Sequence, residues 1–75
     1  MNLEERIFAV VAQNIEKRLA ITMESNLIED LGVDSFSKLM IIAGLEDEFS
    51  ISIDETEFND VITVADIVAK MREAF

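Results

Sequence analysis

The sequence contains no cysteine and no histidine. Without these residues the chain offers no disulfide, no Ser-His or Cys-His catalytic pair, and none of the usual zinc constellations. It also lacks an apolar run of about 18 residues or more, so no segment is expected to span a membrane. The length of 75 residues predicts a single domain over 1–75. We therefore expect a protein that is not an enzyme, with no catalytic residue and no metal site.

The beginning of the sequence gives no sign of a targeting segment. Glu4 and Glu5 lie near its start, and no small-residue cleavage site follows them. A signal peptide would need a positive start, an apolar stretch and such a cleavage site. We therefore expect a cytoplasmic protein.

The net charge is −10, with 16 acidic and 6 basic residues. The stretch from Glu29 to Asp60 is the most acidic part, because Lys38 is its only basic residue. This charge disfavours nucleic acid, whose phosphates would be repelled. It favours partners with basic docking patches, which would be attracted at a salt-dependent rate. Solubility alone would also account for the charge, but its position around one motif favours partner steering.

That motif is Leu31-Gly32-Val33-Asp34-Ser35-Phe36. Gly32 predicts a turn, because glycine adopts positive φ without steric cost. Asp34 and Ser35 both favour the start of a helix, and a dense apolar run follows them. The pattern therefore places an exposed hydroxyl at the positive end of a helix. Since no histidine is available to activate it, Ser35 is either a simple helix cap or a serine that another enzyme modifies.

Hydrophobic spacing predicts an all-α fold, a bundle of three longer helices and one short third helix. The first helix is expected from Leu3 to Leu19, capped by Asn2, and a long loop over 20–33 follows it. A short helical turn is expected within that loop, near 25–29. The second helix is expected from Ser35 to Phe49, and the residues after it, 50–53, should form an extended connector. The short helix is expected over 55–60 with Asp54 as its cap, and the last helix after Thr63.

The second helix is apolar over more than one face. Its spacing predicts an inward stripe of Leu39, Ile42, Leu45 and Phe49. The remaining apolar residues are either packed against further elements or exposed as a docking surface; these are Phe36, Met40 and Ile41.

The motif, the length, the acidity and the order of helices together resemble the acyl carrier protein family. In that family the serine of an Asp-Ser-Leu motif carries a 4′-phosphopantetheine arm, whose thiol holds acyl groups as thioesters. The motif matches at Asp34 and Ser35 and departs at Phe36, where the family usually has leucine. The resemblance implies that Ser35 is the attachment site. It also implies that Asp34 assists the transfer and can contact Mg²⁺ in the complex with the phosphopantetheinyl transferase.

The resemblance further implies a carrier for fatty-acid, polyketide or related lipid biosynthesis. Its partners would be the transferase and acyl-processing enzymes with basic docking patches, and the protein is expected to be a monomer. The residues expected to face these partners lie on the second helix: Phe36, Met40, Ile41, Glu46, Asp47 and Glu48. The residues expected to line a shelter for the acyl chain are Leu45, Ile53, Phe58 and Val61. Gly44 would either leave room for that chain or, as we favour, allow another helix to approach closely.

Two other interpretations remain open. The first is a carrier of amino acids, of the D-alanyl or peptidyl type. Peptidyl carriers typically have Gly-Gly before the serine region, whereas this chain has Gly32-Val33-Asp34. The second is a scaffold that has the same fold but carries no arm.

Overall fold

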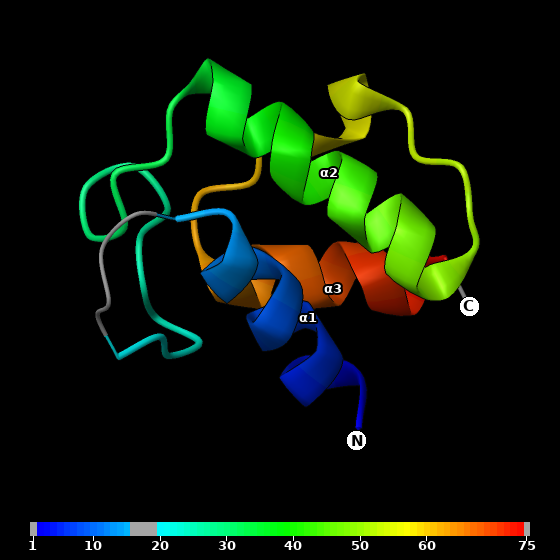
Figure 1. The fold of residues 1–75 in the computed structure, drawn as a ribbon, viewed down its shortest axis with the longest axis horizontal. Helices are drawn as coiled ribbons and strands as arrows, with labels where there is room; N and C mark the ends of the chain where they lie inside the picture. Colours follow the sequence, from blue (N-terminus) through cyan, green and yellow to red (C-terminus); the bar gives the residue numbers. More distant parts are fainter. Residues whose placement is uncertain (1, 16–19, 75) are drawn as a thin grey trace.

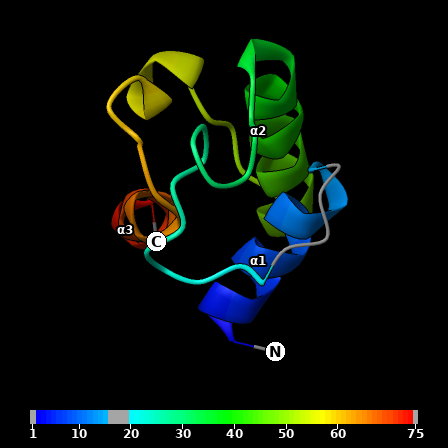
Figure 2. The same ribbon diagram turned by 90° about the vertical axis from the view of Figure 1, so that its left-hand side faces the viewer.

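The computed structural model describes residues 2–15 and 20–74, and the fold it shows is helical. Three α-helices follow in order: α1 (Leu3–Gln13), α2 (Ser35–Phe49) and α3 (Val64–Glu73). A 3-10 helix, η1 (Glu55–Phe58), lies between α2 and α3 in the chain. α1 packs against both α2 and α3, while η1 lies at the opposite end of the molecule from α1 (Figures 1 and 2). The all-α fold is confirmed.

The expected third helix, over 55–60, is a single 3-10 turn rather than an α-helix. Asp54 caps it as predicted, although its carboxylate accepts from the Thr56 N–H. Phe58 is the one buried side chain of η1. A single apolar anchor stabilises too little structure for a longer helix, since helix formation is costly to initiate.

α1 begins as predicted and ends earlier. Asn2 Oδ1 accepts a hydrogen bond from the Glu5 N–H at 2.8 Å. The helix was expected to reach Leu19 but ends at Gln13, because Asn14 occupies the C-cap position with a non-helical backbone. The Asn14 side-chain amide bonds back to the Val10 carbonyl oxygen at 2.8 Å. The expected end itself, over 16–19, lies outside the described residues.

The long loop is fastened to the beginning of α3. An isolated antiparallel bridge joins Asn26 to Thr63. On either side of it the Leu27 N–H donates to the Ile62 carbonyl, and the Val64 N–H donates to the Ser25 carbonyl. The expected turn within the loop is present, since the Asp30 N–H bonds to the Asn26 carbonyl. Apart from this bridge, the described part of the chain shows no strand. Ser50 was expected in the extended connector 50–53, but it is the C-cap of α2 with a left-handed backbone, φ 55°. The residues after it, 51–53, form neither helix nor strand.

α2 has the predicted bounds, but its buried face differs from the predicted stripe. Ile42, Leu45 and Phe49 are buried as expected. Leu39 is 49% exposed, so its assignment to the inward stripe was wrong. Ile41 is buried instead. The reason is that η1, which faces this part of α2, is a single turn and leaves Leu39 partly uncovered.

α3 follows the sequence pattern closely. Thr63 and Asp66 form a capping box, in which each side chain bonds the other's backbone N–H. The four buried residues of the helix recur at helical spacing along the sequence: Val64, Ile67, Val68 and Met71. Two ion pairs hold its second half, from Lys70 to Asp60 at 3.4 Å and from Arg72 to Glu4 at 2.7 Å. None of the described helices is long and apolar enough to cross a membrane.

Three aspartates at helix starts predict how stability depends on pH. Hydrogen bonds from backbone N–H groups lower the pKa of Asp34, Asp54 and Asp66. A lowered native pKa adds stability that is complete above the unfolded pKa, about 3.9. That stability is lost as the pH falls through the native pKa. Urea unfolding between neutral pH and about pH 2.5 should therefore show a loss of unfolding free energy below about pH 4.

The variant Asp66→Asn isolates this effect from the general relief of charge repulsion at low pH. It should show a smaller loss of unfolding free energy on acidification than the wild type. Asp47→Asn removes the same charge from an exposed site on α2 and serves as the control. An acid-induced loss in Asp66→Asn equal to that of the wild type would contradict the role of this carboxylate.

Candidate functional site

The residues before α2 are fixed by the backbone of the loop. Gly32 has φ +69°, in the left-handed region that glycine adopts most readily. The next residue, Val33, is buried and donates its N–H to the Leu27 carbonyl at 2.8 Å. Asp34 is extended, and Ser35 opens α2. The side chain of Ser35 is thus exposed at the rim of the molecule, as the motif predicted.

Asn26 organises this loop, and the sequence analysis did not single it out. Its side-chain oxygen accepts from the Ile28 and Glu29 N–H groups at 3.0 and 2.9 Å. Its own N–H donates to Asp30 Oδ2 at 2.8 Å. Asparagine commonly closes such turns by bonding the backbone two residues ahead. An asparagine within a long loop is itself a sign of such a turn, and Asn26 could have been identified on that basis.

Asp34 is the N-cap of α2, as predicted. Its Oδ1 accepts from the Ser37 N–H at 2.8 Å. This backbone hydrogen bond, with a further one from the Ser37 side chain, lowers the pKa of the Asp34 carboxyl. The carboxylate is exposed and ionised at neutral pH. The positive end of the helix beside Ser35 therefore already holds one negative charge.

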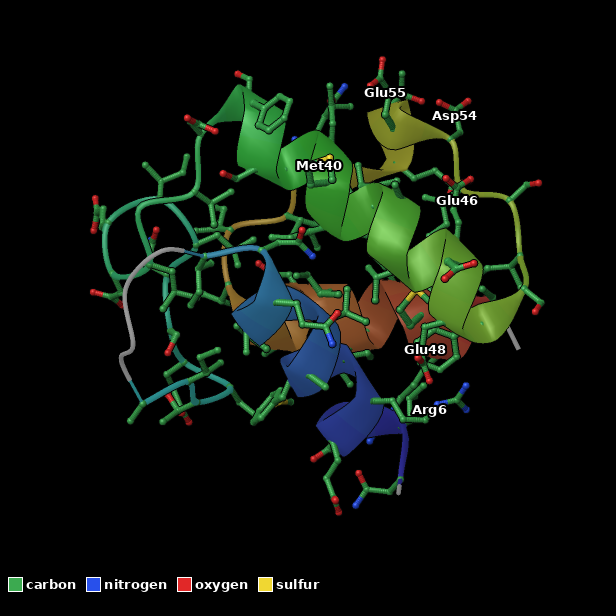
Figure 3. The ribbon with its side chains drawn as sticks, viewed as in Figure 1. Arg6, Met40, Glu46, Glu48, Asp54 and Glu55 are labelled. Atoms are coloured by element: carbon green, nitrogen blue, oxygen red, sulfur yellow. The ribbon has the colours of Figure 1, made fainter. Side chains whose placement is uncertain are left out.

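A groove of about 280 Å³ runs beside Ser35 between α2 and η1. One wall is formed by α2 and the other by η1 and the residue after it. The lining residues are Ser35, Lys38, Leu39, Ile42, Glu55, Thr56 and Asn59. Figure 3 shows Glu55 on η1 at the top of the molecule, above α2. The groove combines one cation (Lys38), one carboxylate (Glu55), an apolar floor and polar side chains that can form hydrogen bonds.

None of the four residues expected to shelter an acyl chain lines this groove. Leu45 and Phe58 are buried in the core, while Ile53 and Val61 are partly buried against it. The groove depends on how η1 approaches α2, which is a contact between segments far apart in the sequence. The spacing of apolar residues along the chain could not predict it.

The outer face of α2 near Ser35 is apolar. Phe36 is 71% exposed and Met40 is 44% exposed, and Leu39 lies beside the groove. Figure 3 shows Met40 on the outer side of the first half of α2. Ile41 is only 2% exposed. The expectation that Ile41 contributes to a docking surface was therefore wrong, because its side chain belongs to the core.

Two of the three acids expected to face partners have partners within the chain. Glu48 forms an ion pair with Arg6 at 2.8 Å, and Glu46 accepts from the Ile53 N–H at 2.9 Å. Arg6 also donates to the Glu48 carbonyl and lies 4.3 Å from the centre of the Phe49 ring. Figure 3 shows Arg6 and Glu48 pointing toward each other. Asp47 remains exposed at the same end of α2.

The chemistry available at this site is that of an exposed serine hydroxyl. The chain has no histidine or cysteine. The described residues also contain no group of three or more acidic side chains that could hold a metal ion. Such a serine can accept a group from another enzyme, and the groove beside it can receive what is attached.

Comparison with known proteins shows which family this chain belongs to. The family model described as the phosphopantetheine attachment site matches residues 5–71. An acyl carrier protein from Rickettsia bellii (strain RML369-C) is 36% identical, covering 96% of this chain and 85% of the relative. An acyl carrier protein from Thermotoga maritima is 34% identical, covering 92% of this chain and 91% of the relative.

A solved structure agrees with this match. A candidate acyl carrier protein from Mycobacterium tuberculosis is similar to this chain with a TM-score of 0.89 and 32% sequence identity. The similarity covers 99% of this chain and 100% of that one. The all-helical arrangement, the match to the attachment-site model and the curated relatives thus agree. The chain belongs to the acyl carrier protein family, whose domain is the attachment site of phosphopantetheine.

Proposed function

We propose that Ser35 carries the 4′-phosphopantetheine arm and that the protein, as one domain over 1–75, delivers acyl groups bound to it as thioesters. The observation that carries this proposal is the position of Ser35: exposed, preceded by its capping aspartate, and on the rim of a groove. The pathways it would serve are fatty-acid, polyketide or related lipid biosynthesis in the cytoplasm. A carrier with one flexible arm raises the effective concentration of its cargo at successive active sites.

The residues at the site fit the arm. The hydroxyl of Ser35 is accessible to a transferase, and the groove beside it has room for part of a slender chain. Attachment would form a bond from Ser35 Oγ to phosphorus and release adenosine bisphosphate from coenzyme A. In this proposal the base that takes the hydroxyl proton belongs to the transferase. Asp34 would assist there and contact Mg²⁺ in that complex.

The docking surface follows from exposure and charge. Phe36 and Met40 give an apolar contact beside Ser35, and exposed Asp47 adds negative charge farther along α2. Partners with a small apolar patch flanked by basic residues would fit, namely the phosphopantetheinyl transferase and acyl-processing enzymes. Docking in this way suits a protein that acts as a monomer and meets each enzyme briefly.

Shelter for the acyl chain is proposed from the core beneath the groove. Ile42 lies on the groove floor and is also part of the core. Parting of α2 from η1 would bring a chain from the groove to Leu45 and Phe58, with Ile53 and Val61 at its edge. Gly44 is not part of this shelter, because it faces α1: a Cβ placed there would lie 2.8 Å from Val10 Cγ1. The expectation of close helix approach at Gly44 is thus confirmed.

Mass spectrometry after incubation with coenzyme A and a broad-specificity transferase tests the proposal. We expect the mass of one phosphopantetheine to be added to the wild type and none to Ser35→Ala. Ser37→Ala, which removes a second hydroxyl from the same turn of α2, is the matched control and should be modified. No addition to the wild type would favour the arm-less scaffold, and modification of Ser35→Ala would place the arm elsewhere.

A further inference from the structure

Lys38 shares the groove with Ser35. The two residues are three apart on α2, so their side chains leave the helix on neighbouring positions of one face. Both line the groove against η1. At this spacing the two Cβ atoms are about 5–6 Å apart. The flexible four-carbon stem of lysine can then place its ammonium group beside whatever is attached to the serine oxygen.

The charges around Ser35 give Lys38 a specific use. Asp34 is ionised and already occupies the Ser37 N–H at the helix start. A phosphodiester on Ser35 would put a second negative charge next to it. Lys38 is the only basic residue between Glu29 and Asp60, a stretch with ten acidic residues. Within this stretch it is therefore the one side chain whose charge can offset that of the phosphodiester.

Lys38 is available for this contact. The ion pairs found among the described residues join Arg6 to Glu48, Lys70 to Asp60, and Arg72 to Glu4. Among the basic residues that the structure describes, Lys38 alone forms no ion pair. Its side chain is half-buried along the groove and is not fully extended into solvent. A half-buried cation is screened less by salt than a fully exposed one.

The groove beyond Lys38 matches the rest of the arm. Leu39 and Ile42 offer apolar surface, and Thr56 and Asn59 offer side chains that can pair with amide groups. Thr56 Oγ1 donates to Asp54 Oδ1 at 2.8 Å, so its oxygen is oriented and can still accept. A group held at Lys38 would therefore leave the rest of the arm pointing along a surface of suitable chemistry.

We propose that Lys38 binds the phosphodiester on Ser35 and thereby directs the arm along the groove toward Thr56 and Asn59. This role rests on the proposed attachment at Ser35. Lys38 acts here as a positioning residue, because it touches the linkage and not the reacting thioester. Loss of one exposed or half-exposed ion pair should change the population of arm conformers in the groove by about two- to fivefold.

The test compares amide NMR spectra of the protein before and after loading, in four chains: wild type, Lys38→Met, Lys38→Arg and Lys70→Met. Methionine keeps the apolar stem of lysine without its charge. Lys70→Met removes the same charge on α3, from a residue that pairs with Asp60 and does not line the groove, and is the control. Mass spectrometry first establishes that each chain carries the arm.

In the wild type, loading should shift the amide signals of Thr56 and Asn59. These shifts should shrink in Lys38→Met by about twofold or more. Lys38→Arg should restore them, and Lys70→Met should retain them. The unloaded spectra of Lys38→Met and wild type should agree near η1, which separates positioning of the arm from a structural effect.

Unchanged shifts in loaded Lys38→Met, or an equal loss in Lys70→Met, would overturn the role of Lys38 and leave Ser35 as the attachment site. Absence of the arm from the wild type would overturn both proposals at the mass-spectrometry stage. If Lys38→Met does not fold, a salt titration of the loaded wild type takes the place of the measurement on this variant. The loading shifts of the wild type should then fall as the ionic strength rises from about 0.01 to 1 M. Shifts that persist unchanged would overturn the proposal.

Discussion

Replacing Leu45 by alanine should lower the free energy of unfolding by about 2–5 kcal/mol. Leu45 is fully buried in the middle of α2, where its side chain belongs to the core shared with α1 and α3. The substitution removes apolar contacts and leaves a cavity that the surrounding helices can fill only in part. A domain of this size has about 4–11 kcal/mol of total stability, so the variant should be close to unfolding.

The matched control is Leu39→Ala, the same chemical change on the same helix. Leu39 is 49% exposed, so its loss should cost less than about 1 kcal/mol. Urea unfolding measures both variants. Far-ultraviolet circular dichroism is the suitable probe, because the chain has no tryptophan or tyrosine. Equal losses for the two variants would contradict the buried face assigned to α2.

The second large effect is expected at Gly44, where alanine should be destabilising in spite of its better helix propensity. Alanine would gain about 1 kcal/mol in an open helix. Here its Cβ would lie 2.8 Å from Val10 Cγ1, and β-branched valine has little freedom to rotate away. Overpacking of this kind costs about 1–3 kcal/mol. We therefore expect a net loss of up to about 2 kcal/mol in Gly44→Ala.

A double-mutant cycle with Val10→Ala identifies the cause. Removing the Val10 methyl groups destabilises the core but makes room for the new Cβ. In that background Gly44→Ala should be neutral or stabilising by up to about 1 kcal/mol. The measurement is the same urea unfolding of the four chains. A cost of Gly44→Ala that is equal with valine and with alanine at position 10 would exclude the contact between α1 and α2 as its source.

Local chemistry allowed the helix starts to be predicted from the sequence. Asn2, Asp34, Asp54 and Thr63 each cap the element that follows. Capping depends on the side chain and the next three residues, so it can be recognised without knowing the rest of the fold. Helix ends were less predictable. α1 ends at Gln13, where the Asn14 side chain bonds to the Val10 carbonyl oxygen. The apolar spacing of the sequence continues beyond this point, so it did not indicate the end.

The buried face of α2 could not be ranked from periodicity alone. When a helix is apolar on most sides, the element that packs against each side decides which residues are covered. For this reason Leu39, which was expected to be buried, is exposed, and Ile41, which was expected on the docking surface, is buried. The exposure of Ser35 was predictable because Gly32 and Asp34 fix it locally. The groove could not be predicted in this way. Thr56 and Asn59 lie beside α2 because the connecting segment 50–59 folds back over it, and no local pattern indicates that path.

The contact of Arg6 with the end of α2 was also beyond sequence reasoning, because 42 residues separate Arg6 from Glu48. It has a practical use for binding experiments. Arg6 holds α1 to the end of α2 that is opposite Ser35, and the first residues of the chain lie on that side of the molecule (Figures 1 and 2). A biotin linker joined ahead of Asn2 would anchor the protein to a sensor surface with Ser35 and its groove facing the bulk solution.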